Sequence, residues 1–324
     1  MNNDVVKVIV TIIILIILTA ICIILYYNFS EKQAPPKEVT ISLPGLGNVF
    51  AEYFGTIAWY FVFGKDARVK INYNYSDIDY IKRLPEFIPY EPEIARQLLS
   101  IPNIKEKVSD YFLRISDWSY NRGILRCMAP LIRKFSQSLD DASTTLKYCD
   151  VVIHFRCADA PRNRHPEYLF QRFRWYRMAL QQAAIRLDKS YNELSVVILS
   201  CNDFIPVDNN ESKKNNQEKQ AILCSSIVNE LVSYLGITDI SIHCGSVRDD
   251  FLLMMNAPCL ISSGSSLSYL AALTNENIMI TPNYLHLTEL YYRDNWIILP
   301  SEELPHDDVV DYDDTPTIIS QLHG

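Results

Sequence analysis

Residues 151–155 read VVIHF, and this apolar run predicts a β-strand buried inside a sheet. Similar short runs recur downstream, each separated from the next by a stretch with helical spacing. The further strands are expected at Val196–Ser200, Ile240–His243, Cys259–Ser262 and Ile278–Ile280, and the helices over Pro166–Leu187, Glu218–Leu235, Asp249–Asn256 and Ser266–Leu273. Strands that alternate with helices in this way predict an α/β fold with a parallel sheet.

A shorter alternation of the same kind precedes this one. Its expected elements are strands at Val39–Leu43 and Arg68–Tyr73, a helix over Val49–Phe63 and a mostly helical stretch over residues 91–139. Because the pattern runs twice, the chain is predicted to hold two α/β domains, residues 39–148 and 149–324.

The N-terminal region carries a long apolar run. Residues 8–27 contain no charge, and about 20 such residues are enough for a helix to cross a membrane. We expect a transmembrane anchor over 8–27, after a tail at 1–7 and before a polar stem at 28–38. A cleaved signal peptide is the alternative, although its apolar region is usually shorter. The flanking charges do not decide the orientation, but a short tail and a large C-terminal body favour a type II protein.

The composition limits the classes of function. Of 324 residues, 48% are hydrophobic and 21% are charged, which fits a globular body and excludes collagen-like and disordered chains. With 30 Lys and Arg against 38 Asp and Glu, the net charge is −8, so nucleic-acid binding is not expected. A small phosphate-containing ligand remains compatible with this charge, because one or two arginines suffice to bind it.

The eight cysteines show no regular spacing and no CxxC pair. Most lie in apolar stretches, so buried free thiols are expected and a zinc site is not. The sequences from Asn74 to Ser76 and from Asn210 to Ser212 are glycosylation sequons, which matter only if the body lies in the lumen.

Three loops after predicted strands contain residues suited to an anionic ligand. The first is Gly45-Leu46-Gly47-Asn48, where two glycines before a helix allow close approach to a ligand. An ordinary strand-to-helix turn is the alternative.

The second loop runs from His154 to Asp159 and reads HFRCAD. Alternation along the strand directs His154 and Arg156 to the same side, and a guanidinium there suits a diphosphate. A structural ion pair between Arg156 and Asp159 is the alternative.

The third loop is Ser262–Ser266, whose small hydroxyl residues at a helix start can bind an anion or simply cap the helix. Asp250 opens the preceding helix and is a further candidate contact, with a helix cap again as its alternative.

Taken together, these segments resemble one family. The motifs GLGN, HFRCAD, VVILSCND and ISSGSSLSYLAAL occur in the order found in fucosyltransferases that form α1,2-, α1,6- or protein O-linked fucose. The resemblance covers about Val39–Asn283, nearly the whole body. It implies a GT-B fold with two Rossmann-like domains, and inverting transfer of fucose from GDP-fucose, or of another sugar from its GDP donor, without a metal. It also implies a glycan or glycoprotein acceptor and a body in the Golgi or ER lumen.

The resemblance also assigns roles by position. Arg156 would contact the β-phosphate and stabilise the departing GDP, while His154 and Asp159 would shape that site. The guanosine and phosphate pocket would be lined by Asp203, Ser263, Ser265 and Ser266, and the donor sugar and acceptor would face Gly45, Gly47 and Asn48. The chain departs from the family at Cys157, where a second arginine is usual.

Two other functions stay open. A metal-dependent GT-A glycosyltransferase would need an acidic pair, either Asp77 with Asp79 or Asp311 with Asp313. A membrane-anchored protein that binds glycans or nucleotide sugars without chemistry would accommodate the change at Cys157. The general base is not identified by the sequence, and Asp159 and Glu167 are candidates by position alone.

Overall fold

A six-stranded sheet, parallel throughout, forms the centre of the protein. Its strands are β5 (Val151–His154), β6 (Ser195–Leu199), β7 (Asp239–His243), β8 (Cys259–Ile261), β9 (Ile278–Pro282) and β10 (Trp296–Leu299). The computed structural model describes residues 17–22, 39–41, 46–69, 71–73, 84–105, 118–138, 149–157, 170–200, 211–262, 265–283, 294–302 and 315–323. The predicted α/β fold with a parallel sheet is thus confirmed.

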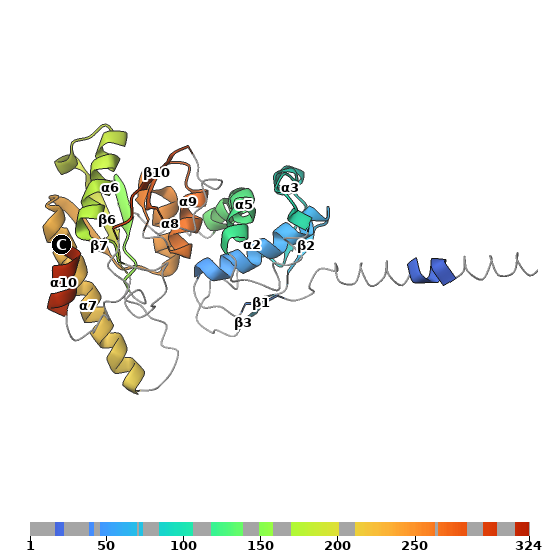
Figure 1. Ribbon diagram of the computed structural model, residues 1–324, viewed down its shortest axis with the longest axis horizontal. Coiled ribbons are helices and arrows are strands. Elements are labelled where there is room, and N and C mark those ends of the chain that lie inside the picture. Colours follow the sequence, from blue (N-terminus) through green and yellow to red (C-terminus); the bar gives the residue numbers. More distant parts are fainter. Residues whose placement is uncertain are drawn as a thin grey trace, which may run out of the picture.

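Helices cover both faces of this sheet. They are α6 (Phe173–Arg186), α7 (Glu211–Leu235), α8 (Val247–Asn256), α9 (Ser266–Thr274) and the C-terminal α10 (Thr315–His323), together with a short 3₁₀ helix at Tyr191–Glu193. In Figure 1, α6, α7 and α10 lie on one side of the sheet and α8 and α9 on the other. The helices following β5 and β6 therefore cover a different face from those following β7 and β8.

Successive side chains of β5 contact the helices on opposite faces of the sheet. Val151 and Ile153 of β5 join a buried cluster with residues of α6, α7 and α10. Val152, between them, joins a second cluster with residues of α8 and α9. Successive side chains of a strand point to opposite faces, so a continuous apolar run is what a sheet covered on both faces requires.

The described residues 39–138 contain two smaller sheets and the longer helices α2, α3 and α5. The elements are β1 (Val39–Ile41), α2 (Leu46–Val62), β2 (Ala67–Arg68), β3 (Ile71–Tyr73), β4 (Phe87–Ile88), α3 (Pro92–Leu99) and α5 (Trp118–Ser138). β1 pairs with β3 in parallel, and β2 pairs with β4 in antiparallel fashion. The single strand expected at Arg68–Tyr73 is therefore wrong, because its two ends pair with different partners.

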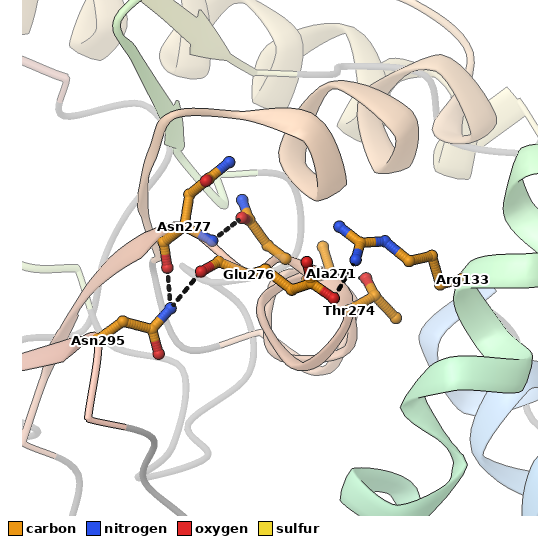
Figure 2. A network of polar contacts seen from close by, with 7 residues as sticks. Arg133, Ala271, Thr274, Glu276, Asn277 and Asn295 are labelled. Carbon is orange, nitrogen blue, oxygen red and sulfur yellow. Dashed lines mark hydrogen bonds and ion pairs between the residues drawn. The ribbon is translucent and has the colours of Figure 1, made fainter.

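The N-terminal helices α2 and α5 pack against α9, on the side of the sheet covered by α8 and α9. One buried cluster contains side chains of α2, α3, α5, α8 and α9 as well as Val152 of β5. A polar contact adds to this packing (Figure 2), where Arg133 of α5 forms an ion pair with Glu276. Asn295 donates to the carbonyl oxygens of Glu276, at 3.1 Å, and of Asn277, so the contact continues to the start of β10.

Two predicted boundaries fall on residues that are not described. The expected boundary between the two domains, at residues 148 and 149, adjoins such a stretch, since residues 139–148 lie outside the described part. Most of the expected span at 8–27 also lies outside it. Residues 17–22 are helical, and their apolar side chains Ile17, Leu18 and Ile21 are exposed. Within the described ranges, no helix is long and apolar enough to cross a membrane.

Candidate functional site

The order of the strands points to one place on the sheet. The spatial order is β10-β9-β8-β5-β6-β7, so the chain begins at β5, moves outward through β6 to β7, and then returns to β8 on the other side of β5. In open α/β sheets, ligands bind beyond the carboxyl ends of the strands where the order reverses. Here that place lies beyond the adjacent ends of β5 and β8.

Two of the predicted loops meet at this place. Ser265 Oγ, which follows β8, lies 3.4 Å from His154 Nδ1 at the end of β5. Ser265 Oγ is also 3.1 Å from Ser268 Oγ, which in turn lies 2.7 Å from Ser262 Oγ. Four polar side chains, from the ends of two adjacent strands and the first turn of α9, therefore form one connected cluster, and its three serines are buried.

One residue of this cluster, Ser265, also caps the N-terminus of α9. Ser265 is the N-cap of this helix, and its hydroxyl accepts from the backbone N–H of Ser268 at 3.2 Å. The capping role that the sequence left open for this loop is thus present. It does not exclude an anion, because the first N–H groups of a helix and its dipole favour negative charge.

The start of α2, which includes Gly47 of the first predicted loop, lies near the same edge. Phe50, in the first turns of α2, makes an edge-to-face contact with Phe251 in α8, with ring centroids 5.5 Å apart. Gly47 is buried at the start of α2. Because Phe251 belongs to the early part of α8, this contact brings the N-terminal ends of α2 and α8 together at the carboxyl edge of the sheet.

The two aspartates of α8 differ in their surroundings. Ser246 is the N-cap, with its Oγ accepting from Asp249 N at 3.1 Å and lying 2.8 Å from Asp249 Oδ2. Asp249 therefore serves the cap, as the sequence allowed. Asp250 is buried, and its Oδ1 lies 3.8 Å from Nε2 of His243 at the end of β7.

His243 was not predicted as a site residue, although its position at the end of a strand was a signal that could have found it. Its ring lies against Gly245, where a Cβ atom would meet Nε2 at 2.4 Å. Any side chain at Gly245 would therefore require the imidazole of His243 to move.

The loop after β5 contains a disulfide bond. Cys157 is bonded to Cys224 of α7, and both residues are buried. The expectation of buried free thiols is wrong for these two cysteines, which are 67 residues apart and meet because α7 packs on the sheet beside β5. The expectation of buried free thiols is confirmed for Cys149 and Cys259.

Arg156 and His154 alternate with buried neighbours. Phe155 and Cys157 are buried, whereas His154 and Arg156 are partly exposed. The ring of Phe155 stacks on Phe170 with centroids 5.8 Å apart. This pattern agrees with the expectation that His154 and Arg156 share one side of the chain.

Several predicted residues are not placed by the structure. Gly45, Asp159, Asp203 and Ser263 lie outside the described residues, as do Glu167 and both acidic pairs considered for a metal, while only the backbone is described for Asn48 and Ser266. Among the side chains that are described, no group of three or more His, Cys, Asp or Glu could hold a metal ion.

The comparisons with known proteins give no relative. No protein-family model, no curated protein and no solved structure matches this chain.

Proposed function

We propose that this protein is a membrane-anchored glycosyltransferase of GT-B fold that transfers fucose, or another sugar carried on GDP, to a glycan or glycoprotein. The observation that carries the proposal is the contact between the loops after β5 and β8. His154 and Ser265 meet where a doubly wound sheet binds nucleotides, and Arg156 belongs to the same loop as His154. The motif resemblance supplies the choice of GDP and fucose.

The residues suit the departure of a nucleoside diphosphate. In the reaction, the acceptor hydroxyl attacks the anomeric carbon, and the bond from that carbon to the β-phosphate oxygen breaks. Negative charge grows on the diphosphate, where the Arg156 guanidinium and the N-terminus of α9 would stabilise it. The acceptor proton passes to a general base, for which Asp159 and Glu167 remain the candidates.

The GT-B arrangement has partial structural support. β1 and β3 are parallel, and α2 lies between them in the chain, which is the βαβ unit from which a Rossmann-like domain is built. The N-terminal end of this α2 lies at the carboxyl edge of the large sheet through the contact of Phe50 with Phe251. The loop carrying Gly45, Gly47 and Asn48 would then face the nucleotide site from the N-terminal domain.

The disulfide supports a lumenal location of the body. Disulfide bonds persist in the ER lumen and in extracellular spaces and are rare in the cytosol. The bond between Cys157 and Cys224 therefore suits a type II protein with its body in the ER or Golgi lumen.

One observation favours binding without catalysis as a second candidate. Cys157 replaces the second arginine of the family and is occupied by a disulfide, so it contributes no positive charge to the diphosphate. A protein of this kind would bind GDP-fucose but release no GDP in the presence of acceptor glycans. A GDP-release assay with GDP-fucose and a panel of glycan acceptors separates the two candidates.

The nucleotide class is tested by thermal shift on the full chain in detergent. GDP, UDP and CMP are compared, each with and without EDTA, because a ligand that binds only the folded state raises the melting temperature. We expect stabilisation by GDP that EDTA does not change. Stabilisation by UDP that EDTA removes would favour the metal-dependent GT-A alternative, and no stabilisation by any nucleotide would contradict the proposal.

A further inference from the structure

The segment that carries Arg156 is attached to the rest of the protein on both sides of that residue. On one side, Phe155 N donates to the carbonyl oxygen of Leu199 in β6 at 2.9 Å, and the Phe155 ring contacts Phe170 and Tyr176. On the other side, Cys157 is covalently bonded to Cys224. Arg156 thus lies between two buried anchors, of which the second is a covalent bond.

The support behind this bond is a packed helix. Cys224 is fully buried in the middle of α7, next to Leu223 and within one turn of Ile227. These residues belong to the same buried cluster as α6 and the strand residues Val151 and Ile153. The bond therefore attaches the loop after β5 to a helix whose own position is set by the core.

We propose that Cys224, through its bond to Cys157, is a positioning residue that holds Arg156 ready for a nucleoside diphosphate. This inference rests on the proposed function, because it concerns the same site. A loop fixed before binding loses less conformational entropy when the ligand arrives, and preorganisation of this kind increases affinity. The chain would thus use position 157, where the family has a second cation, to fix the remaining one.

The test compares GDP affinity and local protection in the full chain in detergent. The first variant is Cys224→Ala, and the second, Cys157→Ala with Cys224→Val, keeps apolar packing without the bond. The matched control is Cys259→Ala, which removes a buried free cysteine of the neighbouring strand β8 from the same cluster. GDP binding is measured by calorimetry well below the melting temperature, and amide hydrogen exchange is followed at Phe155 and Arg156.

Both disulfide variants should bind GDP about tenfold more weakly and exchange the Phe155 amide faster, while Cys259→Ala keeps wild-type affinity. Unchanged GDP affinity in folded disulfide variants would overturn the positioning role. An equal loss of affinity in Cys259→Ala would also overturn it, because general destabilisation would then explain the effect.

The two proposals fail in different ways. If the wild-type protein binds no GDP, the proposed function fails, and hydrogen exchange still tests the positioning. If the disulfide variants exchange the amides of Phe155 and Arg156 faster than the wild type, with unchanged exchange in β9, the bond positions this loop. Unchanged exchange at all of these amides would overturn it.

Discussion

Arg156 is half-buried in a loop whose neighbouring residues, Phe155 and Cys157, are buried. A guanidinium at this place can form two hydrogen bonds with a phosphate, which alanine cannot replace. We expect Arg156→Ala to lower kcat/KM for GDP-fucose by about 100- to 1,000-fold, the usual cost of losing one contact to a developing charge. The measurement is GDP release under steady-state conditions.

The control for this substitution is Arg186→Ala, at an exposed position near the end of α6. It removes the same charge far from the loop after β5, so turnover and melting temperature should stay close to wild type. Turnover in Arg156→Ala equal to that of this control would remove the proposed diphosphate contact.

A second prediction concerns the reactivity of individual cysteine thiols. Burial raises the pKa of the Cys259 thiol to about 12, and that of Cys127 to about 11 despite the nearby Arg126 charge. Because the thiolate is the reactive form, a raised pKa leaves little of it at pH 8. Iodoacetamide should label the exposed Cys244 of the folded protein but neither Cys259 nor the bonded pair of Cys157 and Cys224.

Peptide mass spectrometry identifies the labelled positions. In guanidinium without reductant, Cys259 should become labelled while Cys157 and Cys224 remain unlabelled. Labelling of the last two under these conditions would mean that their disulfide is not formed.

Sequence motifs located part of the candidate site and missed the rest. His154 lies near the end of one predicted strand and Ser265 follows another, and strand order then brings them within 3.4 Å. The bond between Cys157 and Cys224 had no local signal, since it depends on how α7 packs across 67 residues of sequence. Residue type at a strand end is thus readable from the sequence, whereas a partner from a distant helix is not.

At the scale of elements, the beginning of α9 joins helix capping to the site. Ser265 Oγ accepts from Ser268 N and also contacts Ser268 Oγ and His154 Nδ1. Ser265→Ala should lower the free energy of unfolding by about 2 kcal/mol, since it removes a cap worth about 1 kcal/mol and buried hydrogen bonds of similar worth. Chemical denaturation measures this difference.

The N-cap of α8 provides the comparison. Ser246 Oγ likewise accepts from a backbone N–H, but it is exposed and its other contact is only with Asp249 of the same helix. Ser246→Ala should therefore cost about 1 kcal/mol, as an isolated cap does. Equal losses in the two variants would show that the contacts of Ser265 Oγ with His154 and Ser268 Oγ add nothing to the stability that the cap provides.

The elements themselves were predictable where their residue pattern is strong. The apolar runs beginning at Val151 and Val196 form strands within one residue of the predicted bounds, because burial on both faces selects such runs. β10 was missed because the run WIIL at Trp296–Leu299 follows β9 without a recognisable helix between them. α6 begins at Phe173 rather than Pro166, because the backbone of Arg172 is extended and its N–H donates to the carbonyl oxygen of Glu302 at 2.9 Å.

At the scale of the whole molecule, one core joins the N-terminal part to the large sheet. The buried cluster that includes Phe54 of α2 and Leu98 of α3 also includes Met254 of α8 and Leu270 of α9. The repeated alternation in the sequence predicted two domains, and that division remains a proposal. The sequence could not indicate how the two parts pack, because apolar faces on α2 and α5 accept any apolar partner.

The cluster shared by the N-terminal helices, α8, α9 and one face of the sheet predicts that the described body unfolds as one unit. Leu98, in α3, and Ile198, in β6, are fully buried and belong to different clusters. Replacing either by alanine should cost about 2–5 kcal/mol. If the parts are coupled, Leu98→Ala and Ile198→Ala should each shift the same single calorimetric transition to lower temperature.

The control for each of these substitutions is the same change at an exposed apolar residue. Leu99, adjacent to Leu98, is 49% exposed, and Ile185, on α6, is 70% exposed. Leu99→Ala and Ile185→Ala should change the free energy of unfolding by no more than about 0.5 kcal/mol, because they leave no cavity. Two separate transitions, one shifted only by Leu98→Ala and the other only by Ile198→Ala, would contradict the coupling. Two such transitions would mean that the N-terminal part and the large sheet, which meet where α2 and α5 contact α9, unfold as independent domains.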